Sequence, residues 1–207
     1  MRRLEWLLFL SSCLTLARPS PAQDTEIYVV RPEESRFEIR VGKAGLFSVF
    51  GHEHLIEVRR FSGEVRFIAS APNESSVSLE LDAASLTVVD PEVKADERAK
   101  VQAQMEAEAL EVVKFPTIRF VSKKLSLTEI QGELDGEVNG DLTLKEVTRS
   151  LKIPLRIAVA VGKLGARGRF KLKGSAFGVK PVSVAGGSVK TRDELELIFD
   201  LVCERRP

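Results

Sequence analysis

Histidine and cysteine are scarce in this chain. It has 2 histidines and 2 cysteines in 207 residues. The HExxH pattern of metalloproteases, the GxSxG pattern of serine hydrolases and the glycine-rich loop that holds phosphates are absent from the sequence. These absences argue against enzyme chemistry. We therefore expect a non-enzymatic protein with no catalytic residues and no cofactor.

An excess of one charge is also missing. The chain carries 31 basic and 30 acidic residues, which gives a formal net charge of +1. Proteins that bind nucleic acid usually show a basic excess or a basic patch, and no long block of like charge occurs here. We expect no nucleic-acid partner.

A hydrophobic run of membrane-spanning length is the third absence. The apolar stretch that begins at Trp6 is shorter than the roughly 20 residues that a transmembrane helix needs. Arg2 and Arg3 precede this stretch, and the sequence SPA at 20–22 supplies small residues where a signal peptidase cleaves. We expect residues 1–22 to be a signal peptide and residues 23–207 to be the mature domain. The protein would then be periplasmic or secreted, with no transmembrane span after processing.

A lipoprotein signal is the alternative. The sequence LSSC at 10–13 has the pattern in which Cys13 becomes acylated, but only twelve residues precede Cys13. A charged region plus an apolar region of about 7–15 residues needs more room, so soluble export is favoured. Without Cys13, Cys203 has no disulfide partner, and its position on an apolar strand face predicts a buried, unreactive thiol.

Apolar and polar residues alternate with a period of two along most of the chain. This period predicts strands with one buried and one solvent-facing side. The segments at 27–30, 37–41, 46–50, 63–67, 77–81, 118–120, 138–144, 151–157, 170–172 and 195–201 are the predicted strands. Such a number of strands is typical of a barrel or a sandwich. We expect an all-β fold, a single closed antiparallel barrel of about eight strands.

One segment departs from this period. Residues 95–113 are rich in Ala, Glu, Gln and Lys, and Val101, Met105, Ala109 and Val112 recur at spacings of three and four. That pattern predicts one inserted amphipathic helix around 95–113, lying across one end or flank of the barrel.

A barrel that spans an outer membrane also alternates, but it carries aromatic girdles at both interfaces. Residues 23–207 contain Tyr28 as their only tyrosine and no tryptophan. The sequence therefore predicts that the apolar strand faces point inward and that the charged faces meet water.

The interior of such a barrel either fills with side chains or encloses one small ligand. All but one of the 11 phenylalanines lie after residue 22, and phenylalanine lines a wall without a hydroxyl group that needs a partner. Small residues at predicted inward or near-inward positions would leave space unfilled, namely Gly63, Ala83, Gly140, Ala158, Ala160 and Gly174. These features favour an apolar guest, and a filled core is the alternative.

Five segments, taken in order, resemble the YceI-like family. They are the opening SRF (35–37) with GLF (45–47), FGHEH (50–54) and FSG (61–63), then 77–86, FPTIRF (115–120), GDLTLKEVTR (140–149) and FGV (177–179). The resemblance covers about residues 26–204 and rests on the order of the segments. Two positions depart from the family pattern: Glu146 stands where the family often has glycine, and Ala176 replaces an acidic residue.

This resemblance implies a lipocalin-like barrel of exported bacterial proteins, with an elongated lumen that holds a polyisoprenoid or quinone-type tail. The expected partner is thus an isoprenoid-type lipid. The residues expected to line the lumen are Phe50, Phe67, Leu79, Leu81, Phe120, Leu142, Leu144, Phe170, Leu197 and Phe199.

The only histidines, His52 and His54, share one face of a predicted strand. We expect them near a barrel opening, where an imidazole can hydrogen-bond a polar lipid head group. A metal site completed by a further ligand is an alternative, as is a barrel with a filled core and a structural or interaction role. A homodimer is compatible with the sequence.

Overall fold

The structure, a computed structural model, describes residues 24–44, 53–180, 183–184 and 189–207. The predicted strand at 46–50 lies outside the described residues. The strands are β1 (Thr25–Val30), β2 (Arg36–Ala44), β3 (His54–Val58), β4 (Phe61–Ile68), β5 (Ser76–Asp82), β6 (Leu86–Val88), β7 (Thr117–Ile130), β8 (Glu133–Leu144), β9 (Val147–Ala160), β10 (Lys163–Lys173), β11 (Ser183–Val184) and β12 (Val189–Arg205).

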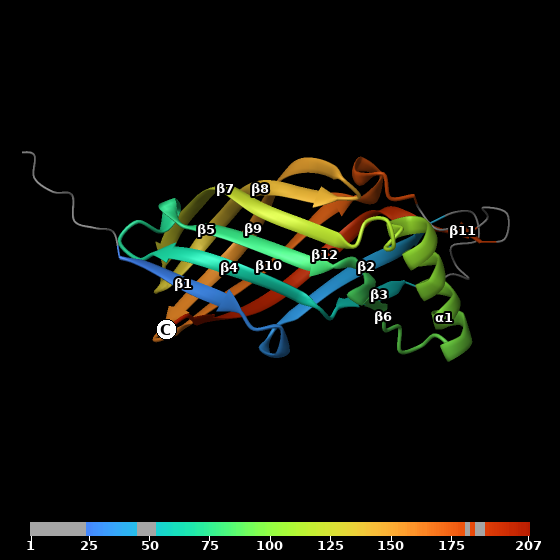
Figure 1. Cartoon of the computed structure of the whole chain (residues 1–207), viewed down its shortest axis with the longest axis horizontal. Helices are drawn as coiled ribbons and strands as arrows, with labels where there is room; N and C mark the ends of the chain where they lie inside the picture. The colour runs from blue at the N-terminus through green and yellow to red at the C-terminus, as the bar shows by residue number, and fades with distance from the viewer. Residues whose placement is uncertain (1–23, 45–52, 181–182, 185–188) are drawn as a thin grey trace, which may run out of the picture.

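Eight of these strands close into an antiparallel barrel (Figure 1). Their order around the barrel is β1-β4-β5-β7-β8-β9-β10-β12, and β12 pairs back with β1, where Tyr28 lies opposite Arg205 and Val30 opposite Cys203. The predicted closed antiparallel barrel of about eight strands is confirmed.

At one end the sheet continues from β12 into β2, β3 and β6. β1 and β2 follow the same edge of β12 and are separated by the one-turn helix η1 (Pro32–Glu34). A second short helix, η4 (Ala83–Ser85), separates β5 from β6; η3 (Pro72–Glu74) links β4 to β5. β6 is the last strand in this order.

The predicted helix forms at this end of the barrel, opposite the C-terminus (Figure 1). α1 (Ala95–Gln104) continues as a π-helical turn, η5 (Met105–Leu110), and ends where Glu111 takes a left-handed φ of 51°. The prediction of 95–113 was therefore three residues too long, and Val113 is 98% exposed. None of the helices within the described residues has the length and hydropathy to cross a membrane.

The far end of the barrel, away from the helix, is densely packed. Tyr28, Leu164 and Cys203 are each 1% exposed, and the rings of Tyr28 and Phe67 meet edge to face with their centroids 6.3 Å apart. Burial raises the pKa of the Cys203 thiol to about 11, so the thiol stays protonated at neutral pH. The prediction that Cys203 is buried is confirmed.

The small residues do not leave space in the way that the sequence suggested. A Cβ atom on Gly140 would lie 2.5 Å from the Phe120 ring, and one on Gly63 would lie 2.4 Å from the Leu79 side chain. Both positions are glycine because a neighbouring side chain covers them. Ala158 and Ala160 are exposed, since the buried positions of β9 are the odd-numbered ones such as Ile153 and Ile157. The inward prediction for these two alanines was wrong.

Gly140 and Gly165 form a matched pair for a stability test. Gly140→Ala should cost about 1–3 kcal/mol, because the methyl group overlaps the Phe120 ring and the Val121 carbonyl oxygen. Gly165→Ala meets nothing within 4 Å and should stabilise by about 0.4–1 kcal/mol through the unfolded chain. Urea unfolding measures both free energies, and equal values for the two variants would contradict the contacts assigned to Gly140.

Candidate functional site

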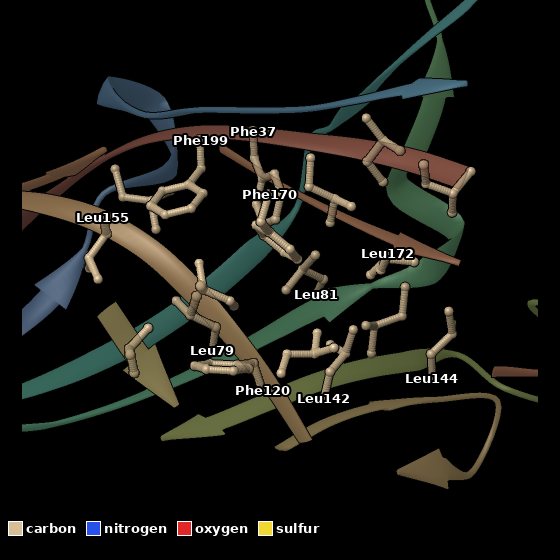
Figure 2. Close-up of a pocket in the computed structure, with 18 of the residues that line it drawn as sticks. Phe37, Leu79, Leu81, Phe120, Leu142, Leu144, Leu155, Phe170, Leu172 and Phe199 are labelled. Atoms are coloured by element: carbon tan, nitrogen blue, oxygen red, sulfur yellow. The ribbon is translucent and has the colours of Figure 1, made fainter. Parts of the chain in front are cut away.

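An apolar cavity of about 160 Å³ lies inside the barrel. Side chains from opposite walls converge on it, with Phe37, Phe170 and Phe199 facing Leu79, Phe120 and Leu142 (Figure 2). The lining consists of Phe37, Ile39, Val77, Leu79, Leu81, Leu86, Leu110, Ile118, Phe120, Val138, Leu142, Leu144, Leu151, Ile153, Leu155, Ala166, Phe170, Leu172, Val179, Leu195, Leu197, Phe199 and Leu201. Within the part of the chain that the structure describes, no polar atom is exposed to this cavity.

Most of the residues predicted to line the lumen lie in this wall. They are Leu79, Leu81, Phe120, Leu142, Leu144, Phe170, Leu197 and Phe199. Phe67 instead packs on Tyr28 at the dense end of the barrel, and Phe50 lies outside the described residues. Contact of any of these side chains with a ligand stays a prediction.

Sequence reasoning overlooked Ala166 as a lining residue. It lies on the same face of β10 as Phe170 and Leu172. The alternation of inward and outward residues along this strand could therefore have identified Ala166 as an inward residue. Ala166 is the smallest side chain in the wall, and its Cα partners are Ile157 on β9 and Leu201 on β12. It is the position where a larger side chain would project into the free volume.

The cavity reaches the end of the barrel that carries the helix. Leu110 of η5 and Val179, which follows the short helix η6 (Gly174–Phe177), contribute to the wall at that end. The far end is filled by the packed group around Tyr28, Leu164 and Cys203.

The wall determines what the cavity can bind. An apolar cavity of similar volume in another protein stays dry and takes up benzene, while pockets for drug-sized ligands are typically about 300–1,000 Å³. Each Å² of apolar surface removed from water contributes roughly 25 cal/mol. The site can thus hold an apolar group by exclusion of water.

His54 lies at the helix end of the barrel, on the same strand face as Ile56, which pairs with the lining residue Ile39. Its Nδ1 lies 2.7 Å from a carboxylate oxygen of Asp90, and the other oxygen accepts the backbone N–H of Leu55. Asp90 is 3% exposed.

This carboxylate holds the His54 ring in one orientation. His54 is not among the cavity-lining residues, and His52 lies outside the described residues. The described part of the chain contains no group of three His, Cys, Asp or Glu side chains placed to hold a metal ion. The head-group and metal roles of the histidines stay predictions.

Comparison with known proteins agrees with this architecture. The profile of the YceI-like domain matches residues 28–203. No curated protein matches the sequence.

Solved structures share the fold at low sequence identity. BcnA of Burkholderia cenocepacia is 20% identical with a TM-score of 0.65, and the alignment covers 84% of this chain and 98% of BcnA. A polyisoprenoid binding domain from Saccharophagus degradans is 12% identical with a TM-score of 0.61, covering 86% and 98%. The Campylobacter jejuni YCEI protein is 20% identical with a TM-score of 0.53, covering 73% and 84%. At these identities the likeness shows the fold.

Proposed function

The chain belongs to the YceI-like family, and we propose that it is a carrier that holds the tail of an isoprenoid-type lipid in its barrel cavity. The observation that carries this proposal is the wall of the cavity, which is built from aliphatic and phenylalanine side chains and exposes no polar atom among the described residues. A structurally similar domain from Saccharophagus degradans is a polyisoprenoid binding domain, which supports the choice of ligand class.

Burial of the tail supplies the binding energy. Each buried methylene group contributes about 0.8 kcal/mol, so a chain of several isoprene units is poorly soluble in water and needs a carrier to cross it. Such a wall offers no acid, base or nucleophile to a bound tail, which suits a carrier that leaves its cargo unchanged.

We assign the polar head group to the helix end of the barrel, near His54. Asp90 accepts a hydrogen bond from Nδ1–H of His54, which leaves Nε2 as an acceptor for a hydroxyl group of the ligand. A quinone or other head group without a donor would instead require the charged imidazole. His54→Phe should then weaken binding of a lipid alcohol more than binding of its hydrocarbon tail alone.

Export of the protein is part of the proposal. The basic start, the apolar stretch after it and the sequence SPA at 20–22 support cleavage after Ala22. An exported carrier would move the lipid across the aqueous space outside the inner membrane. N-terminal sequencing of protein recovered from the periplasm or medium should begin at Gln23; protein found only in the cytoplasm would contradict export.

Mass spectrometry of an organic extract tests the lipid proposal. Protein purified from a bacterial host should carry an isoprenoid-type lipid at close to one molecule per chain, whereas heat-denatured and washed protein should carry none. Extracts without lipid, together with failure to take up an added isoprenoid alcohol, would refute the carrier function. Stoichiometric zinc, copper or iron by elemental analysis would favour the metal-binding alternative instead.

A further inference from the structure

Lys145 lies in the tight turn between β8 and β9, yet its side chain is only 9% exposed. Lys145 and Glu146 both take left-handed backbone angles, with φ of 50° and 61°. Two such residues form the turn that matches the twist of a hairpin, so Glu146 keeps the turn without glycine. This turn directs a buried ammonium group towards the helix end of the cavity.

The Lys145 ammonium group contacts two segments far from it in sequence. Nζ donates to the Ala109 carbonyl oxygen at 3.1 Å and to the Gly178 carbonyl oxygen at 3.4 Å, and it pairs with the Glu111 carboxylate. An ammonium group has three donors, and all three are used. Its neighbours in these segments, Leu110 and Val179, line the cavity.

Each contact occurs at the C-terminal end of a short helix. The last carbonyl groups of a helix lack intrahelical partners, and a cation near them is favourable. Ala109 is in the last turn of η5, and Gly178 follows the last residue of η6. One ammonium group therefore satisfies the ends of both helices that bound the cavity.

The other side of the helical segment is attached to the sheet edge. The Gln102 side chain accepts the Val88 N–H at 2.8 Å and donates to the Leu86 carbonyl oxygen at 2.9 Å, so it takes the place of a neighbouring strand beside β6. α1 is thus fixed to β6 at Gln102. Residues 105–111, which we call the lid, are tied to the β8–β9 turn through Lys145.

The turn at η6 has further support. Ser175 donates its backbone N–H and its hydroxyl group to Asp193, and Arg149 donates to the Ala176 carbonyl oxygen at 3.2 Å. Loss of the Lys145 contacts would therefore free the lid more than it frees η6.

We propose that Lys145 is a latch, and that an apolar guest enters and leaves the cavity when the contacts of Lys145 with the lid break. This inference rests on the proposed function for the identity of the guest. Among the described residues, the far end is closed by side chains, and Tyr28, Leu164 and Cys203 there are each 1% exposed.

Lys145→Met tests the latch, because methionine keeps an unbranched chain of similar length in the same backbone conformation and removes the charge. Stopped-flow mixing with a naphthylamine fluorophore that brightens in apolar surroundings should show association and dissociation both faster by about tenfold. The Kd should change by less than about threefold, because the Lys145 contacts are lost equally from the guest-free and the guest-bound protein. Lys145→Arg, which keeps the charge and donors, should restore slow exchange.

Lys114→Met is the matched control. Lys114 follows the lid, with Nζ 4.8 Å from the centre of the Phe115 ring. Its backbone N–H donates to the Glu111 carbonyl oxygen, and Lys114→Met leaves that bond in place while it removes the same side-chain charge. It should leave both rates unchanged. Equal acceleration by Lys114→Met and Lys145→Met would mean that charge at the opening sets the rates, and the latch would be refuted.

Amide hydrogen exchange provides a readout that needs no guest. In Lys145→Met, exchange in residues 105–111 should be about tenfold faster, with the strands of the far end unchanged. If wild-type protein binds no apolar probe, the carrier function fails, while faster exchange in Lys145→Met still shows that Lys145 holds the lid closed. A folded variant with wild-type exchange in the lid overturns the latch. If Lys145→Met does not fold, Glu111→Gln can replace it, because it removes the ion pair and keeps both carbonyl contacts of Lys145. Its guest exchange and its amide exchange in the lid should both be about threefold faster than in wild type.

Discussion

Replacement of Ala166 by phenylalanine should weaken uptake of an apolar guest roughly 100-fold while the barrel still folds. Ala166 lines the cavity from β10, and the free volume is about 160 Å³, close to the size of cavity that one benzene molecule occupies in another protein. The new ring would displace about four methylene groups of a bound chain, worth about 3 kcal/mol or roughly a 100-fold loss of affinity. Overpacking should cost about 1–3 kcal/mol of stability.

Titration with the naphthylamine fluorophore measures this loss of affinity, and displacement of the bound fluorophore by farnesol measures it for an isoprenoid alcohol. Ala158→Phe is the matched control. Ala158 is exposed on the neighbouring strand β9, so this substitution adds the same ring outside the barrel. It should bind as wild type does. Undiminished binding by folded Ala166→Phe would place the guest outside this cavity.

The strands and their inward faces followed from sequence because a period of two leaves each strand few alternatives. Leu79, Leu142 and Leu197 were assigned inward for this reason, and each lies in the cavity wall. The number of such strands was compatible with a barrel or a sandwich, and the resemblance to the YceI-like family implied the barrel. The length of the helix was overestimated because the left-handed φ of Glu111, which ends it, leaves no mark in the apolar spacing.

The distribution of free space did not follow from sequence. Gly140 was read as an empty position, although the Phe120 ring covers it, and Ala166 was overlooked. Which side chain covers a glycine depends on rotamers and on neighbours from other strands, neither of which a periodic pattern records. The role of Lys145 depends on contacts with Ala109 and Gly178, residues 36 and 33 positions away, so the periodic pattern gave no indication of it.

Phe170→Ala should lower the free energy of unfolding and enlarge the cavity. The loss of a buried ring typically costs about 3–5 kcal/mol, and the lower value is expected here because Phe170 already faces free space. For a domain of this size, that corresponds to a Tm lower by about 10 °C. A guest that fills the new space should restore stability, because a ligand at 100 times its Kd contributes about 2.7 kcal/mol.

Phe67→Ala is the matched control for this test, since Phe67 is 5% exposed and packs on Tyr28 outside the cavity wall. Thermal unfolding of the wild type and both variants, with and without farnesol, separates packing from binding. Phe67→Ala should lose stability and gain no more from farnesol than wild type gains, because the cavity that takes the guest is unchanged. Phe170→Ala should gain more, since its cavity admits more of the chain. An equal gain in all three proteins would mean that Phe170 does not bound the space that the lipid tail occupies.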